Sequence, residues 1–196
     1  NETLSELRKH LMIEDTGPMK PGKEEKFLGD LIMMTEKGYR VRPNPKLIET
    51  LLACLGLENA NSTRIPGSKT DAREPDEEPK LDEKGAGEFR VGTGKAMFLS
   101  RRRSDLQYSV KECARDMKNP TEKSRGHLNK VGRYVKGTED FALYLEPEPL
   151  DSSGRFHVQV KTDTDWAADK VERKSTTGLA CKVQGATAKT KCNTQS

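Results

Sequence analysis

The sequence contains few aromatic and few large aliphatic residues, which limits the apolar core that it can form. Of its 196 residues only ten are Phe, Tyr or Trp, and Leu, Ile, Val and Phe together make up 36. Contents this low approach those of disordered chains. Disordered chains also carry a large net charge, whereas here 35 Lys and Arg oppose 31 Asp and Glu and leave +4. We therefore expect a folded chain with a thin core.

Long apolar runs and closely spaced cysteines are also missing. No stretch approaches the roughly 18 consecutive apolar residues of a membrane helix, and residues 1–10 lack the basic-then-apolar pattern of a signal peptide. We therefore expect no membrane partner. The four cysteines form no CxxC pair and lie too far apart for a disulfide framework, which favours a reducing, intracellular location. The chain starts without Met, and we expect it to be a segment of a longer protein.

Local patterns predict an α+β fold. Leucines at helical spacing indicate a short amphipathic helix over 2–13. The apolar run 26–34, a turn at 36–38 and the alternating residues 39–42 predict a β-hairpin. Asn44 is predicted to cap a helix with an apolar face, and Gly56 to end it.

The charge changes sign in the middle of the chain. Residues 58–88 are acidic and contain three prolines, so we predict a mobile linker. Residues 89–136 contain thirteen Lys and Arg against four Asp and Glu. Helical spacing there predicts one helix capped by Ser104 and another ended by Gly137. Short strands are predicted over 141–145 and 156–160.

Two patterns that suggest small-ligand sites fail on spacing. Gly92-Thr93-Gly94-Lys95 lacks the earlier glycine and the following Ser or Thr of a phosphate-binding loop, so we predict a flexible turn before a helix. The histidines at 10, 127 and 157 share no ligand spacing with the cysteines, so we expect no zinc site.

Two clusters of charged residues are candidate sites. The candidate nucleic-acid-binding residues are Arg101, Arg102, Arg103, Lys130, Arg133 and Lys136. On charge alone, a phosphate-binding surface and a solvated basic surface explain them equally well. Asp163, Asp165 and Asp169 follow a predicted strand, whose rigid end suits an oxygen ligand for Mg²⁺. Acidic turns are usually solvated, so this pattern also leaves both interpretations open.

Several motifs resemble the Pol polyprotein of copia-type LTR retrotransposons. In that family a helix ending in a Leu-Lys-Gly-Thr-like signature precedes a Ser-Asp-Ala-Asp-Trp-Ala-Gly-Asp strand end and then Arg-Lys-Ser-Thr-Ser-Gly. The matching segments here are Arg133–Thr138, Asp163–Asp169 and Arg173–Gly178. Upstream, Lys26–Gly29 and the strand from Gly38 resemble the primer-grip hairpin. The resemblance covers nearly the whole chain and is weakest over 89–118, where three arginines replace part of an apolar helix. We expect the core to be degraded there.

The resemblance implies a domain organisation. Residues 1–57 correspond to the end of the palm and a thumb-like region of reverse transcriptase, and 58–88 to the acidic linker. Basic connection-like helices occupy 89–138, and 139–196 form a truncated, N-terminal part of a ribonuclease H-like domain.

The resemblance also implies roles and partners. Asp163 matches the first catalytic, metal-binding carboxylate of ribonuclease H, which holds Mg²⁺ in the intact parent enzyme, whereas Asp165 and Trp166 match structural neighbours. The implied partners are an RNA/DNA hybrid or template–primer duplex and the rest of the Pol polyprotein. The implied location is the cytoplasm, in virus-like particles of an active element, and the nucleus.

The sequence lacks the remaining catalytic carboxylates of both activities, so we expect the chain alone to catalyse neither reaction. Our leading hypothesis is a segment of an RNA-directed DNA polymerase/ribonuclease H polyprotein that grips the duplex. The alternatives are a non-catalytic nucleic-acid-binding remnant and a poorly folded pseudogene product.

Overall fold

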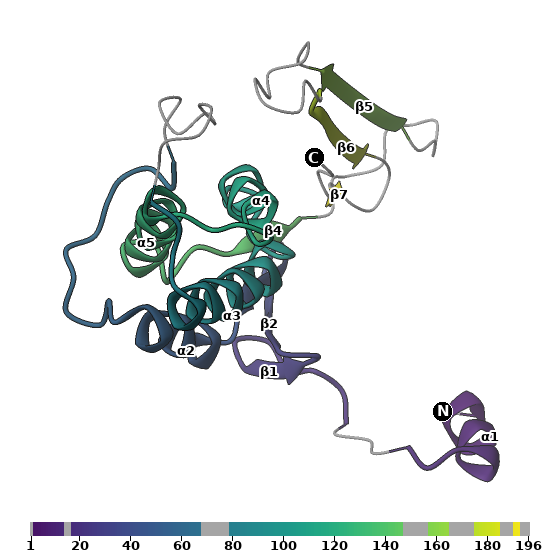
Figure 1. Cartoon of the computed structure of the whole chain (residues 1–196). Coiled ribbons are helices and arrows are strands. Elements are labelled where there is room, and N and C mark those ends of the chain that lie inside the picture. Colours follow the sequence, from purple (N-terminus) through teal and green to yellow (C-terminus); the bar gives the residue numbers. More distant parts are fainter. Residues whose placement is uncertain are drawn as a thin grey trace.

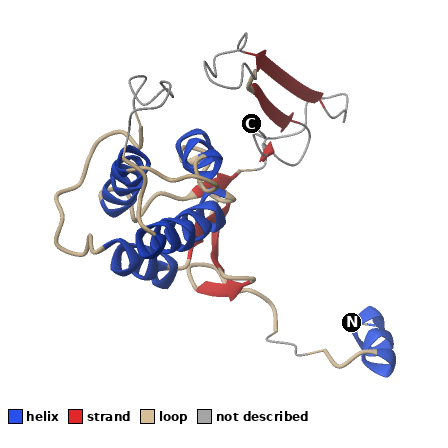
Figure 2. Cartoon of the chain, in the orientation of Figure 1, coloured by secondary structure: helices blue, strands red, loops and turns tan. Residues whose placement is uncertain are grey.

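The computed structural model describes residues 2–13, 17–67, 79–146, 157–164, 175–184 and 190–192. These residues form helices and two separate antiparallel sheets, which confirms the α+β class (Figures 1 and 2). The helices are α1 (Glu2–His10), α2 (Pro45–Leu55), α3 (Glu83–Ser100), α4 (Gln107–Arg115) and α5 (Glu122–Lys136). The strands are β1 (Glu24–Phe27), β2 (Asp30–Thr35), β3 (Gly38–Pro43), β4 (Leu143–Leu145), β5 (His157–Thr164), β6 (Thr177–Gln184) and β7 (Thr190–Cys192).

The first sheet has the strand order β1-β2-β3-β4. The predicted hairpin is confirmed as β2 and β3, in which Thr35 pairs with Gly38 across the turn. Its first strand is not the continuous run 26–34, because a turn at 28–29 separates β1 from β2 and pairs Phe27 with Asp30. The predicted strand at 141–145 is β4, and it pairs with β3 through Val41 and Leu143. The sequence grouped this strand with residues 139–196, but it completes the N-terminal sheet because the chain returns beside the otherwise unpaired edge of β3. We call this sheet together with α2–α5 the helical body.

Helix α2 begins and ends where the sequence predicts. The Asn44 side chain accepts a 3.0 Å hydrogen bond from the Lys46 backbone N–H, and Pro45 occupies the first helical position. Gly56 closes the helix with a left-handed φ of 65°. This conformation favours glycine.

Helix α3 corrects two predictions. Residues 83–88, assigned to the linker, are its first turns, capped by Asp82. Gly92–Lys95 are not a flexible turn but lie inside the helix, where Gly92 and Thr93 are buried. A Cβ on Gly92 would lie 2.9 Å from a Leu55 methyl and 3.0 Å from a Leu128 methyl, so the missing side chain lets three helices approach each other.

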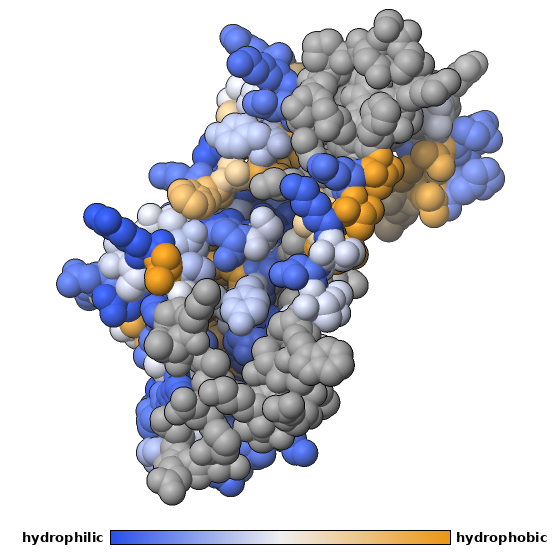
Figure 3. Space-filling view, turned by 90° about the horizontal axis from the view of Figure 1, so that it is seen from above, coloured by the Kyte–Doolittle hydropathy of each residue, from blue (hydrophilic) through white to orange (hydrophobic). Residues whose placement is uncertain are grey.

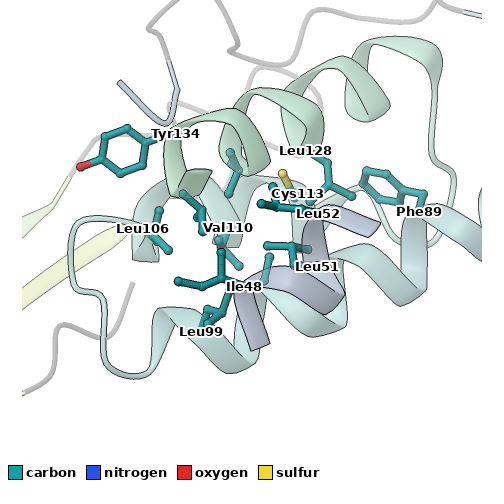
Figure 4. Packing of buried hydrophobic residues seen from close by; sticks show 13 residues of the cluster. Ile48, Leu51, Leu52, Phe89, Leu99, Leu106, Val110, Cys113, Leu128 and Tyr134 are labelled. Carbon is teal, nitrogen blue, oxygen red and sulfur yellow. The ribbon is translucent and has the colours of Figure 1, made fainter. Parts of the chain in front are cut away.

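The core of the helical body is a single cluster of thirteen buried residues contributed by α2, α3, α4, α5 and the turn before α4. Figure 4 shows side chains such as Leu51, Phe89 and Leu128 converging between the helices. Phe89, Ala96 and Leu99 all come from α3. The expectation of a degraded core over 89–118 was therefore wrong: the three arginines follow the end of α3 and leave its apolar face complete.

The ends of α4 and α5 are capped differently. Ser104 is not the predicted N-cap, because residues 104–106 form a turn and α4 starts at Gln107 without a side-chain cap. Thr121 and Ser124 form a reciprocal capping box at the start of α5, and Gly137 ends that helix as predicted.

The second sheet has the order β5-β6-β7, and we call it the C-terminal sheet. The predicted strand at 156–160 corresponds to β5, although Phe156 lies outside the described residues. Val158 and Val160 are 62% and 54% exposed, and they pair with Val183 and Cys181 of β6.

Among the described residues, no helix is both long and apolar enough to cross a membrane. On the face drawn in Figure 3, hydrophobic residues gather in a few separate places among hydrophilic ones.

Candidate nucleic-acid interface

The turn between β1 and β2 presents apolar side chains on a strained backbone. Phe27 and Leu28 are 61% and 78% exposed. Leu28 has a φ of 49° and Gly29 a φ of 87°, and Leu28 is the one non-glycine residue with positive φ in the described part of the chain. A left-handed leucine is unfavourable by about 1 kcal/mol. The two-residue turn between the paired residues Phe27 and Asp30 requires positive φ at both central positions, and an exposed leucine is an unfavourable residue for the first of them.

The β1–β2 turn, which we call the tip, lies beside the outer face of α3. A Cβ on Gly29 would come within 3.7 Å of the Phe98 ring, and the Arg101 guanidinium lies 5.7 Å from the centre of that ring. A groove of about 390 Å³ runs between α2 and α3. It is lined by Leu47, Thr50, Val91, Gly94, Lys95 and Phe98. The tip and the groove thus place apolar surface and two cations next to each other.

The three consecutive arginines have different surroundings. Arg101 is exposed. Arg102 Nε donates to Asp30 Oδ2 at 2.6 Å and joins the end of α3 to the start of β2. Arg103 is only 4% exposed. The structure therefore presents the charge of Arg101 at the surface and compensates that of Arg102 with a carboxylate.

Arg103 is the centre of a hydrogen-bonded network. Its guanidinium donates to Asp105 Oδ2 at 2.8 Å, to the Thr138 carbonyl at 2.9 Å and to Thr138 Oγ1 at 2.7 Å. Tyr134 OH also donates to Asp105 Oδ2, at 2.9 Å. The guanidinium carbon lies 5.8 Å from the Tyr134 ring centre and 5.1 Å from that of Phe141. Figure 4 shows the Tyr134 hydroxyl pointing away from the core cluster.

This network shifts the pKa values of two of its members. Burial alone would raise the pKa of Asp105, but the hydrogen bonds and charge of Arg103, together with the hydrogen bonds from Tyr134 and the backbone, hold it below its ordinary value. Burial, followed by the hydrogen bond to Asp105, raises the pKa of Tyr134. Arg103 and Asp105 therefore form an ion pair, and Tyr134 is neutral around pH 7.

The basic residues of α5 contact backbone carbonyls of the 58–61 loop. Arg133 Nε donates to the Asn61 carbonyl at 2.6 Å. Lys136 Nζ donates to the carbonyls of Glu58 and Ala60, the latter at 3.0 Å. Lys130 lies half-buried on the same helix. Because carbonyls are uncharged, these contacts orient Arg133 and Lys136 without neutralising them.

Asp163 lies near the end of β5, where it is exposed and pairs with Gly178 of β6. Two motifs that are separate in the sequence thus meet at one register position. A Cβ on Gly178 would lie 3.6 Å from the Asp163 carbonyl oxygen and 4.0 Å from its Cβ. Asp165, Trp166 and Asp169 lie outside the described residues. Within the described ranges, no three His, Cys, Asp or Glu side chains are grouped closely enough to hold a metal ion.

The contacts of Arg103 were not predicted from the sequence. Its spacing to Asp105 is the local signal that could have suggested an ion pair. Nothing local indicates Thr138 or Phe141, which follow α5 and approach Arg103 only in the folded body.

The sequence matches no family model and no solved structure. It does match curated proteins of Arabidopsis thaliana. The uncharacterized mitochondrial protein AtMg00810 is 29% identical over 185 residues, which are 91% of this chain and 69% of that protein. The retrovirus-related Pol polyproteins from transposons RE1 and RE2 are 30% and 31% identical over 91 residues, which are 46% of this chain. Those 91 residues are only 6% of each polyprotein. At this level the resemblance is confirmed: the chain is a distant homologue of copia-type retrotransposon Pol polyproteins and of AtMg00810.

Proposed function

We propose that the chain is the thumb, connection and initial ribonuclease H segment of a retrotransposon polyprotein, and that it grips a template–primer or RNA/DNA hybrid duplex. The observation that carries this proposal is the exposed, strained tip at Leu28-Gly29. Non-glycine residues held in the left-handed region cluster at active sites and ligand clamps. The tip belongs to the segment that resembles a primer grip.

Two kinds of surface contribute to the grip. The tip and the adjoining α2–α3 groove supply apolar contact with sugars and base edges. Arg101, Arg133 and Lys136, together with Lys130, supply charge for phosphates, which position a duplex without reading its sequence. Arg102 and Arg103 have a lesser part, because Asp30 and Asp105 compensate their charges.

Asp163 is the proposed first carboxylate of the ribonuclease H site in an intact parent enzyme. Its exposed position beside Gly178 leaves room for a ligand. One carboxylate does not hold the two Mg²⁺ ions of that chemistry, which need ligands from several elements. The described residues of this chain therefore do not make a complete metal site, and we propose no metal-dependent step for the chain alone.

The test is binding of an RNA/DNA hybrid as a function of salt concentration. We expect affinity to fall steeply with salt, and Arg101→Gln/Arg133→Gln to reduce the slope by about two, since each phosphate contact contributes about 0.9. Leu28→Asn removes the apolar side chain but tolerates a left-handed φ. We expect this variant to bind more weakly with an unchanged slope.

Lys37→Gln is the matched control, because Lys37 is exposed in the β2–β3 turn, at the opposite end of β2 from Leu28. It should bind like the parent. Salt-independent binding by the parent, or full affinity of Leu28→Asn, would contradict the proposal.

The non-catalytic remnant remains the second candidate, favoured by the contrast between an intact helical core and a C-terminal sheet whose described residues contain one carboxylate, Asp163. Hybrid cleavage by a chain extended at both ends separates the two. Cleavage that Asp163→Asn abolishes supports the enzyme segment. Binding without cleavage by the extended chain supports the remnant.

A further inference from the structure

The outer face of α4 is covered more than its position predicts. Leu106, Val110 and Cys113 point into the core, which leaves Lys111, Glu112 and Arg115 on the opposite side. These three side chains are nevertheless only 18%, 15% and 22% exposed. Charged side chains on the outer face of a helix are usually well exposed. Glu112 pairs with both Lys111 and Arg115, so the three side chains cover one another in part, and Lys111 is covered further by a contact outside the helix.

A direct contact from this face reaches the C-terminal sheet. Lys111 Nζ donates a 2.8 Å hydrogen bond to Thr176 Oγ1. The same ammonium group lies 2.9 Å from Glu112 Oε1 and 5.1 Å from the centre of the Tyr108 ring. Lys111 is thus held by neighbours on its own helix in a position that faces Thr176.

Thr176 lies at the end of the sheet that carries Asp163. It directly precedes β6, in which Thr177 pairs with Thr164 and Gly178 pairs with Asp163. A contact at Thr176 therefore anchors the Asp163 end of the sheet, whereas the His157–Gln184 pair lies at the opposite end.

We propose that Lys111 is a positioning residue, which fixes the orientation of Asp163 relative to the helical body by docking Thr176 on α4. Its importance for catalysis rests on the proposed function, since Asp163 matters for chemistry only in a hybrid-cleaving parent. The docking itself does not depend on nucleic acid. We expect the loss of the Lys111–Thr176 hydrogen bond to loosen the sheet.

The test measures whether the two parts tumble together, using ¹⁵N relaxation of the full chain without nucleic acid. In the parent, backbone amides of β5 and α5 should report the same rotational correlation time. Lys111→Met keeps the aliphatic stem and removes the ammonium group. We expect the apparent correlation time of the β5 and β6 amides to fall in this variant, with a shift of the Asp163 and Gly178 amide signals.

Three further variants test whether the hydrogen bond itself, rather than the helix or the aliphatic stem of Lys111, holds the sheet. Thr176→Val removes the acceptor without altering α4, and it should release the sheet even if Lys111→Met disturbs the helix. Lys111→Arg retains a donor and should restore joint tumbling, which a merely structural role of the aliphatic stem would not predict. Lys118→Met changes an exposed lysine just after α4 and should have no effect.

Separate correlation times in the parent, or joint tumbling in both Lys111→Met and Thr176→Val, would overturn the proposal. Failure of hybrid binding would overturn the proposed function and leave the docking intact. The two failures are therefore distinguishable.

Discussion

The helical body and the C-terminal sheet use their apolar residues differently. In the helical body, buried side chains such as Leu128 and Val131 are at most 1% exposed and contact several helices. In the C-terminal sheet, Val158 and Val160 are more than half exposed. The comparison teaches that burial stabilises the body, whereas strand pairing and the contact with α4 hold the described part of the sheet. Removing methyl groups should therefore lower the free energy of unfolding more in the helical body than in the C-terminal sheet.

The largest expected effect comes from a core truncation. Leu128→Ala should lower the free energy of unfolding of the helical body by about 3 kcal/mol, because it leaves a cavity between α2, α3 and α5. Val160→Ala in the sheet should cost less than about 0.5 kcal/mol, because the side chain already contacts water. Urea unfolding followed by amide signals from both regions measures the two values. Equal losses in the two variants would refute the contrast.

The next largest effect should come from the Arg103 network. Arg103→Met leaves Asp105 without its cation and Thr138 without two donors, and we expect a loss of about 2 kcal/mol. Arg101→Met is the matched control, since Arg101 is exposed, and should stay within about 0.5 kcal/mol of the parent. If urea unfolding shows the same loss of unfolding free energy for both substitutions, the network does not stabilise the body.

The same network predicts the pH dependence of the body. The folded-state pKa of Asp105 lies below its ordinary value of 3.8, so its contribution is present above that pH and is lost as the pH falls further. The folded-state pKa of Tyr134 lies above its ordinary value of 10.0, so its contribution is present below pH 10.0 and is lost as the pH rises further. Arg103→Met should weaken the acid dependence and Tyr134→Phe the alkaline one, as measured by urea unfolding across pH.

The smallest effects should come from two glycines that are two residues apart in α3. Gly92→Ala forces methyl groups of Leu55 and Leu128 to move and should destabilise the body by about 1 kcal/mol. Gly94→Ala meets no atom within 4 Å and should stabilise the helix by up to about 1 kcal/mol. Thermal unfolding of both variants provides the comparison, and a stabilising Gly92→Ala would show that the helices do not pack as closely as described.

Local elements were predictable where their signals are local. The cap at Asn44, the stop at Gly56 and the β2–β3 hairpin all depend on residues within a few positions of each other. The prediction was wrong over 83–88, which acidic charge and prolines assigned to the linker, and over 92–95, where glycines were interpreted as turn residues. In the folded body Gly92 instead gives two neighbouring helices room to approach, a requirement that no pattern within α3 reveals.

The candidate site was predictable only in part. The resemblance placed Leu28 and Gly29 in a primer-grip-like hairpin, but the turn at these two residues was not predicted. The register places Asp163 opposite Gly178. The charge pattern could not show that Arg101 is exposed and Arg103 buried, because the burial and partners of an arginine depend on segments distant in the sequence. The contact between Lys111 and Thr176 spans 65 positions and has no local signal.

The sequence by itself determined α1, α2, α4 and α5, the two ends of α2, the β2–β3 turn and the homology to retrotransposon Pol polyproteins, because periodicity, turn residues and motifs are properties of neighbouring positions. It did not predict α3, whose glycines and acidic start have no helical pattern of their own. Only the tertiary structure decided which basic side chains keep their charge at the surface, where β4 pairs, and which face of α4 holds the C-terminal sheet. These features depend on which side chains meet in space, and that follows from how segments distant in the sequence pack together.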